Sequence, residues 1–176
     1  MRWTLDDQDF LLRKAEESDL DRVLALLQQA GKWLQTKNTN QWDYYVTDLQ
    51  GNTDEVRDSI NSQHTYILET DGKTVASVTL EDTPNEWDCS IWEEAVEQTG
   101  TVYLHRVVVD RDYAGKDIGG KLIEWACETA KENGKKRIRF DCLASNSGLN
   151  RYYQKRYTRV GIANNYGEHS KYEIPL

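Results

Sequence analysis

The segment from residue 102 to residue 143 constrains the fold more than any other part of the chain. Apolar side chains are expected on both faces of its first strand: Val102, Leu104 and Val108 on one, and Tyr103, Val107 and Val109 on the other. A strand covered on both faces lies inside a sheet. After a glycine-containing turn, apolar residues recur at helical spacing from Ile118 to Ala130, and Arg137–Leu143 is a second strand candidate. This order predicts a βαβ unit with parallel strands.

Other segments supply further strands and helices around this unit. In chain order, we expect a strand at 10–15, helices at 18–35 and 54–62, strands at 64–70 and 73–80, a short helix at 150–157, and strands at 158–162 and 170–174. Asp71-Gly72 suits a two-residue hairpin turn. Residues 81–100 are predicted to form an insertion or an extra short helix. No linker divides the sequence, so residues 1–176 are interpreted as a single domain.

Composition excludes several classes of protein. Lys and Arg total 22 against 30 Asp and Glu, which gives a net charge of −8 and argues against a nucleic-acid partner. No apolar run reaches the roughly 18 residues of a membrane span, and no signal-peptide pattern opens the chain. The three cysteines, Cys89, Cys127 and Cys142, are widely spaced. They indicate reduced thiols in a cytoplasmic protein, and no Cys or His spacing predicts a metal site.

The turn after the first of the two parallel strands is the candidate site of chemistry. Gly115, Gly119 and Gly120 precede or open the helix, so their N–H groups could point into a concavity that binds phosphate. The alternative is that these glycines only permit a tight turn, and on the glycines alone the two interpretations weigh equally. A P-loop is nearly matched by Gly115, Gly120 and Lys121, but Leu122 stands where the Mg²⁺-binding hydroxyl should be.

A better match covers Tyr103 to Gly161, which resembles the GCN5-related N-acetyltransferase (GNAT) superfamily. Ala114–Gly119 lies on that family's R/Q-x-x-G-x-G/A signature, with Ala114 in place of Arg or Gln and Asp117 in place of the first Gly. Asn146, followed seven residues later by Tyr153, matches a second signature, although the usual Gly-Phe after it is missing. The resemblance implies an α/β (α+β) fold: a mixed, mostly antiparallel sheet with a central pair of splayed parallel strands, flanked by helices.

The resemblance also implies acetyl-CoA as cosubstrate, lying between the two splayed strands. The implied cofactor-binding residues are Val107, Val109, Arg111, Gly115, Lys116, Asp117, Ile118, Gly119, Gly120, Lys121 and Asn146. The acceptor amine would attack directly, and Tyr153 would protonate the leaving thiolate as general acid. Tyr153 could instead be a core aromatic, with Tyr152 as its substitute, and Asn146 could be only a helix N-cap. Dimers are frequent in this superfamily, so a homodimer is an expected partner state.

A general base is needed because alkylamines are mostly protonated at neutral pH. His105 has the right pKa range; the alternatives are that it packs against a neighbouring helix, or that a water chain ends at Glu81, Asp82 or another carboxylate. Acceptor binding is expected from the aromatic residues Trp33, Trp42 and Tyr45.

Two functions remain open beside the nucleotide-binding P-loop alternative, which predicts Mg²⁺-dependent ATP binding. The first is an acetyl-CoA-dependent N-acyltransferase that acts on the primary amine of a small molecule or peptide. The second is a CoA-binding module of the same fold with little or no turnover, which the departures at Ala114 and Asp117 motivate.

Overall fold

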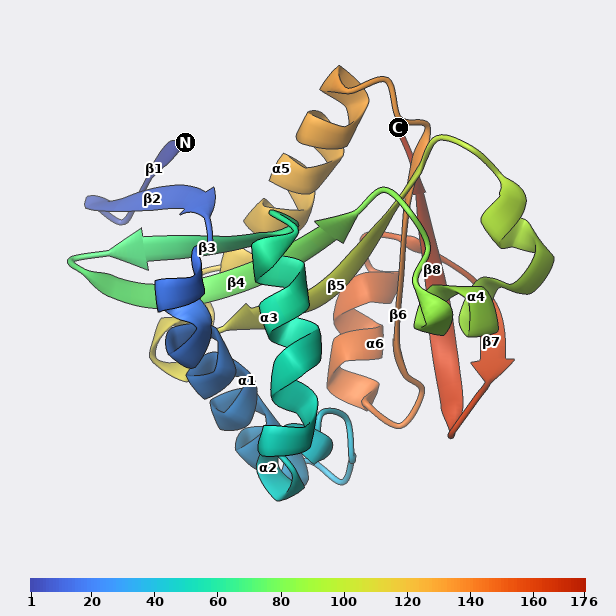
Figure 1. Cartoon of the computed structure of the whole chain (residues 1–176), viewed down its shortest axis with the longest axis horizontal. Coiled ribbons are helices and arrows are strands. Elements are labelled where there is room, and N and C mark those ends of the chain that lie inside the picture. Colours follow the sequence, from blue (N-terminus) through green and yellow to red (C-terminus); the bar gives the residue numbers. More distant parts are fainter.

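Eight strands form one sheet in the order β1-β2-β3-β4-β5-β6-β8-β7 in a computed structural model that describes residues 1–176 (Figure 1). The strands are β1 (Arg2–Leu5), β2 (Gln8–Lys14), β3 (Thr65–Thr70), β4 (Lys73–Glu81), β5 (Thr101–Val109), β6 (Arg137–Leu143), β7 (Thr158–Asn164) and β8 (Glu168–Pro175). The α-helices are α1 (Leu20–Gln35), α2 (Tyr44–Thr47), α3 (Thr53–Asn61), α4 (Glu86–Trp92), α5 (Ile118–Glu132) and α6 (Ser147–Gln154). Only the β5–β6 pair is parallel. The mixed, mostly antiparallel sheet predicted from the resemblance is therefore confirmed.

Helices cover both faces of this sheet, and each face has its own core. On β3, Leu68 belongs to the core under α5, whereas its neighbour Ile67 belongs to the core under α1 and α3. Because successive strand residues point to opposite faces, the two cores lie on opposite sides of the sheet. Figure 1 shows α1 and α3 together on one side, with α5 beyond the strands. None of the helices combines the length and the apolar character needed to cross a lipid bilayer.

Local sequence signals predicted most elements correctly. Asp71 and Gly72 have φ angles of 49° and 74°, the two left-handed residues that a type I′ hairpin turn requires. The predicted helices at 18–35 and 54–62 correspond to α1 and α3. The short helix α6 begins at Ser147 rather than at residue 150, and β1 was not predicted. Residues 81–100 contain α4, as one of the two alternatives expected.

The predicted assignment of β5 side chains to two faces is wrong beyond its middle. Ser77 of β4 pairs with Val108 and Thr79 pairs with His105, so β5 has one residue more than β4 between these pairs. Such a bulge reverses which residues face each side. Val108 accordingly packs in the core under α1 and α3, while Val107 and Val109 pack against the core under α5. No local signal in the sequence marked this extra residue.

The parallel strands β5 and β6 pair only at their beginning. Their register runs from Thr101↔Arg137 to Tyr103↔Arg139 and then ends, while β6 continues to pair with β8 as far as Leu143. Residues 104–109 of β5 therefore have an open edge toward β6. The sheet contains a gap that widens toward the start of α5 and α6, as the resemblance implied for splayed strands.

Candidate active site

A cavity of about 950 Å³ occupies the gap between β5 and β6. Its lining comes from both faces of the sheet. Val107 and Val109 of β5 and Tyr153 of α6 represent the α5 side, whereas Trp33 of α1 and Tyr45 of α2 represent the other. The gap therefore joins the two sides of the sheet, so that a ligand bound on one side can present an atom to the other.

The turn before α5 has a row of unused hydrogen-bond donors. The main-chain N–H groups from Gly115 to Gly120 donate to no protein acceptor, and the first intrahelical bond reaches back from Lys121 to Asp117 O at 3.1 Å. Consecutive free N–H groups at a helix start bind anions, phosphate above all. A Cβ built on Gly119 would lie 3.9–4.0 Å from Val109 and Val107, so this row of donors lies beside two residues that line the cavity, although none of residues 115–120 lines it. These residues fit a diphosphate.

Asp117 occupies the signature position where glycine is usual, and its backbone explains how. Its φ of 55° is left-handed, a conformation that Asp and Asn tolerate better than most residues. Its carboxylate accepts hydrogen bonds from the Tyr152 hydroxyl at 2.5 Å and from Arg156 at 3.2 Å. Gly120 makes room for this contact, since a Cβ there would lie 2.7 Å from both Asp117 Oδ1 and the Tyr152 hydroxyl. The negative charge is thus held toward α6 beside a cation.

The three predicted phosphate-binding cations take different positions. Arg111 lines the cavity, and its guanidinium lies 3.7 Å from the centre of the Trp33 ring. Lys116 pairs with Asp6 at 2.6 Å, and that hydrogen bond lowers the pKa of Asp6. Lys121 makes no ion pair. Arg111 thereby joins the expected cofactor end of the cavity to the expected acceptor wall.

Tyr153 lies at the floor of the cavity. Its ring packs edge-on against Phe140 with centroids 4.9 Å apart, and the residue is 7 % exposed. The hydroxyl forms no hydrogen bond within the protein, and burial raises its pKa well above the usual value. The phenol is therefore protonated at any physiological pH and free to donate. Tyr152, the substitute candidate, is engaged by Asp117.

Asn146 has the capping role that sequence reasoning offered as its alternative. Its side-chain oxygen accepts a hydrogen bond from Leu149 N at 3.2 Å, which caps α6. Its amide donates to Gln41 Oε1 at 3.1 Å. Asn146 still lines the cavity, but its own hydrogen bonds hold the β6–α6 corner against the loop before α2.

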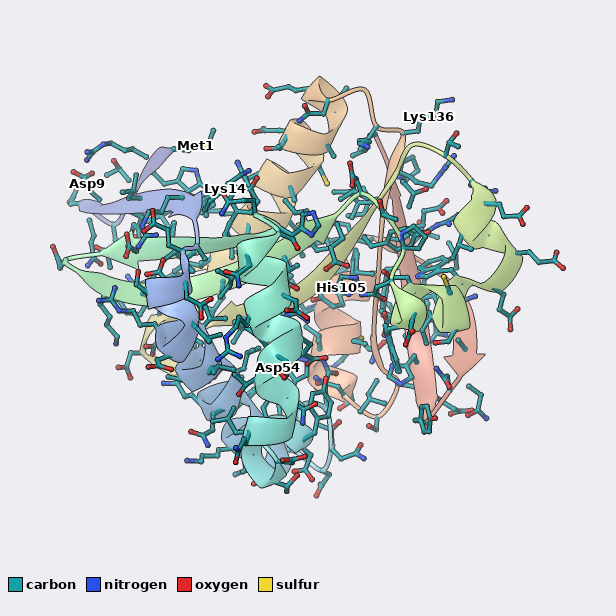
Figure 2. The ribbon with its side chains drawn as sticks, in the orientation of Figure 1. Met1, Asp9, Lys14, Asp54, His105 and Lys136 are labelled. Atoms are coloured by element: carbon teal, nitrogen blue, oxygen red, sulfur yellow. The ribbon has the colours of Figure 1, made fainter.

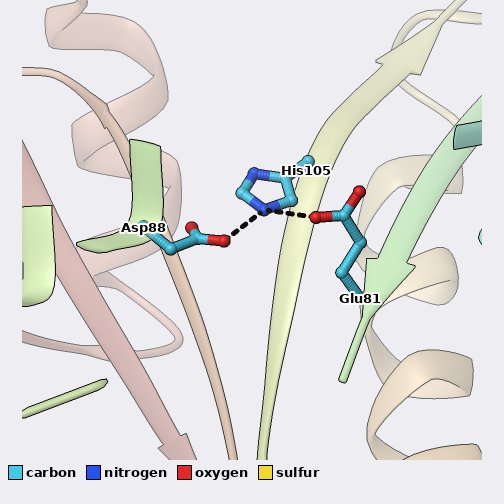
Figure 3. A group of neighbouring side chains, drawn as sticks. All are labelled: Glu81, Asp88 and His105. Atoms are coloured by element: carbon cyan, nitrogen blue, oxygen red, sulfur yellow. Dashed lines mark hydrogen bonds and ion pairs between the residues drawn. The ribbon is translucent and has the colours of Figure 1, made fainter. Parts of the chain in front are cut away.

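Leu104, Val107 and Val109 face the core under α5. His105, labelled in Figure 2, follows Leu104 and therefore projects from the opposite face of β5. Its Nε2 lies 3.0 Å from Asp88 Oδ2 and 3.7 Å from Glu81 Oε2 (Figure 3). Burial lowers the pKa of His105, but the hydrogen bond and charge of Asp88 outweigh it and raise the pKa above its usual value. Asp82, the other carboxylate considered, is exposed and pairs with Lys135 at 3.4 Å.

Sequence reasoning missed Asp88. The residue is 1 % exposed and starts α4 together with Asn85, whose side chain accepts from Asp88 N at 2.9 Å while Asp88 Oδ2 accepts from Asn85 N at 3.1 Å. The spacing Asn-x-x-Asp is a helix-start signal that could have located α4. It could not have shown that the same carboxylate reaches His105.

The predicted acceptor residues all line the cavity, on the α1–α2 side. Trp33 is 36 % exposed, whereas Tyr45 is 1 % exposed and donates to Glu55 Oε1 at 2.7 Å. Trp42 is half-buried and packs edge-on against Tyr45, with centroids 6.4 Å apart. Of the three side chains, Tyr45 is fixed within the wall, and Trp33 and Trp42 keep surface available.

A splayed parallel pair, a row of free N–H groups at the following helix and a cavity through the sheet are the features that the resemblance to acetyl-CoA-dependent transferases implied. Residues 20–157 match the acetyltransferase (GNAT) family. The chain belongs to this family and is an acetyltransferase, and acetyl-CoA is the cosubstrate that the family uses.

Individual relatives agree with this family. The chain is 30 % identical over 138 residues to the uncharacterized N-acetyltransferase YesJ of Bacillus subtilis, covering 78 % of this chain and 74 % of that protein. A GNAT-family acetyltransferase structure from Listeria monocytogenes covers both chains completely with a TM-score of 0.81 at 26 % identity. The PaiA N-acetyltransferase of Thermoplasma acidophilum, in complex with coenzyme A, has the same fold: its TM-score is 0.72 at 16 % identity, over 95 % of this chain and 99 % of that one.

Proposed function

We propose that the protein moves the acetyl group of acetyl-CoA to the primary amine of a small molecule or peptide by direct attack within a ternary complex. The observation that carries this proposal is the gap between β5 and β6. It extends from Val107 and Val109, beside which the free N–H groups of residues 115–120 lie, to His105 on the other side of the sheet. Acetyl-CoA supplies an activated thioester, and the protein binds it so that the thioester faces the acceptor amine.

The first part of acetyl-CoA that the protein binds in this proposal is the diphosphate. The free amides from Lys116 to Gly120 bind it, and Arg111 and Lys121 add positive charge nearby. The pantetheine arm follows the open edge of β5, where main-chain groups of Val107 and Val109 bond to it as an added strand would. An N–H at that edge stabilises the oxyanion that develops on the thioester carbonyl, an effect worth about 3 kcal/mol.

Proton transfer divides between two residues on opposite sides of the gap. Neutral His105 accepts the proton of the acceptor ammonium, directly or through water, and Asp88 stabilises the imidazolium that forms. Tyr153 donates to the leaving sulfur, since its buried phenol is always protonated. The amine nitrogen forms the new bond to the acetyl carbon as the carbon–sulfur bond breaks.

Direct transfer is favoured over a covalent acetyl-enzyme by the only cysteine in the cavity. Cys142 is buried, and burial raises the pKa of its thiol to about 12. A thiol that holds its proton at neutral pH is a poor nucleophile. No base contacts its sulfur, so nothing activates it.

Tyr153→Phe tests the proposal because it removes the free hydroxyl and keeps the ring. We expect kcat for acetyl transfer to fall about 100-fold, with the dissociation constant for CoA changed less than twofold. CoA release is measured across a panel of amines, and CoA binding by calorimetry. Tyr157→Phe is the matched control, since Tyr157 packs against the same Phe140 with centroids 5.7 Å apart but does not line the cavity.

Two results would count against the proposal. Equal kcat in the Tyr153→Phe variant and the wild type would remove Tyr153 from the chemistry. Tight CoA binding with no CoA release for any amine would identify a binding module instead of an enzyme with this acceptor class.

A further inference from the structure

Arg106 is the residue where the backbone of β5 departs from a regular strand. It lies within the bulge, next to His105, and has a left-handed φ of 49°. A non-glycine residue rarely adopts this conformation, and such strain is often found at functional sites. The bulge lets both neighbours leave the strand on the same side. His105 reaches Asp88 of α4, and Arg106 donates to Ser59 of α3.

The guanidinium of Arg106 has no acidic partner. No carboxylate oxygen lies within the 4.0 Å of an ion pair, and the bond to Ser59 Oγ is its only hydrogen bond. Two other arginines, the half-buried Arg13 and the buried Arg139, are paired: Arg13 with Asp19 at 2.7 Å and Arg139 with Glu173 at 2.8 Å. Arg106 is half-buried and lines the cavity. A partly desolvated, unpaired cation with four remaining donors is suited to an anion.

Two carboxylates lie close to the His105 ring, and one of them also lies close to the partner of Arg106. Ser59 Oγ, which accepts from Arg106, lies 3.5 Å from Glu81 Oε1. The second oxygen of Glu81 is 3.7 Å from His105 Nε2, and Asp88 is 3.0 Å from the same nitrogen. Carboxylates beside the base attract an ammonium group, whereas Arg106 attracts a carboxylate. The cation of Arg106 and the carboxylate of Glu81 are both within hydrogen-bond distance of the Ser59 hydroxyl.

We infer that the acceptor is an α-amino acid whose carboxylate binds Arg106 while its amine faces His105. This inference rests on the proposed function and narrows its acceptor class. A zwitterion with both groups on one carbon complements a cation next to an acid-flanked base better than a simple amine does. Exposed parts of Trp33 and Trp42 supply a surface for the side chain.

The experiment compares each L-amino acid with the amine that lacks only its carboxylate, for example L-phenylalanine with 2-phenylethylamine and L-leucine with 3-methylbutylamine. Wild-type kcat/KM is expected to favour the best amino acid over its matched amine by about tenfold or more. Arg106→Gln should bring the two values within twofold, mainly by raising KM for the amino acid. Arg106→Lys should recover part of the preference.

A purely electrostatic role of Arg106 predicts something else. Its charge also lowers the pKa of His105, so removing it would shift the pH profile equally for amino acids and amines. Equal losses for both members of a pair, or a wild type that prefers the amines, would overturn the inference while leaving acetyl transfer to amines intact. If CoA binds but neither the amino acids nor the amines give CoA release, the proposed function itself is refuted. Melting temperatures verify that both variants are folded.

Discussion

The first third of β5 and the rest of the strand differ in what they contact and in what they can do. Residues 101–103 pair with β6, and beside them Arg139 is 3 % exposed, bonded to Glu173, Ala95 O and Gln98, with its guanidinium 4.6 Å from the Trp92 ring centre. Residues 104–109 pair with β4 but not with β6. In the closed part Thr101 bonds to Gln98 O and Arg137, and Arg139 has three partners, whereas the buried Tyr103 hydroxyl has none. The open part lines a cavity.

The difference shows how one strand can serve both stability and catalysis. Residues 104–109 of β5 have no backbone hydrogen bonds to β6. The relative position of the two strands therefore depends on contacts at their paired beginning. The pairing of residues 101–103 with β6 and the hydrogen bond from Arg137 to Thr101 at 3.1 Å hold the two strands together there, and Arg139 ties β6 to β8 and to residues 95–98. Substitutions in the closed part should therefore change stability first, and substitutions in the open part should change kinetics first.

Arg139→Met should give the largest effect. It leaves Glu173, Ala95 O and Gln98 without their partner, and breaking a buried ion pair costs about 3 kcal/mol or more. We expect the free energy of unfolding, from urea titration, to fall by about that amount. Because Glu173 remains partly exposed, Arg139→Met combined with Glu173→Gln should recover part of the loss.

Kinetics of the folded fraction complete that test. At a temperature where the Arg139→Met variant is folded, kcat/KM should stay within about twofold of wild type. A large kinetic loss with unchanged stability would mean that the closed part also shapes the reaction, and the division of labour along β5 would be wrong.

The hairpin between β3 and β4 and the turn before α5 could be predicted from the sequence because their signals are local. The hairpin at Asp71-Gly72 and the turn from Gly115 to Gly120 are each read from adjacent residues. The bulge at Arg106 could not be read in this way. It arises from the register between β4 and β5, and a register depends on both strands and on the cores that they cover.

Asp88→Asn addresses the base in the open part. Asp88 raises the pKa of His105, so its neutralisation should lower that pKa and move the acid limb of the kcat/KM–pH profile to lower pH. At neutral pH we expect Asp88→Asn to change kcat/KM several-fold, whereas His105→Gln should lower kcat/KM about 100-fold. An acid limb that stays in place after Asp88→Asn would assign the titration to another group.

Stability should follow the same pair with a defined sign. Because the folded-state pKa of His105 is raised, the protonated ring contributes stability below its unfolded pKa of about 6.5, and this contribution is lost as pH rises through the folded pKa. Asp88→Asn should therefore lower the melting temperature more at pH 5.5 than at pH 9.

The acceptor side was the least predictable part of the site for a related reason. His105 was a candidate from its residue type, but its partners Glu81 and Asp88 come from β4 and α4, and Glu81 in turn contacts Ser59 of α3. Ser59, Glu81 and Asp88 meet only because three separate segments pack around the bulge. No spacing within the sequence encodes such a meeting, whereas the cradle is contained in one turn.

Asp117→Asn should give the smallest effect and sharpens the comparison from the cradle side. Asn tolerates the left-handed φ of 55° and its side-chain oxygen can still accept from the Tyr152 hydroxyl, so only the charge is lost. A carboxylate near a diphosphate disfavours it, and Arg156 offsets that effect only in part. We expect KM for acetyl-CoA to fall about two- to threefold, with a smaller difference at high salt.

Asp117→Gly is the control variant. It keeps the backbone freedom but removes the contact with Tyr152, and therefore separates the effect of the charge from the effect of that contact. If Asp117→Asn instead raises KM, the carboxylate acts by holding the turn in place, and the cradle depends on side chains more than its free backbone donors indicate.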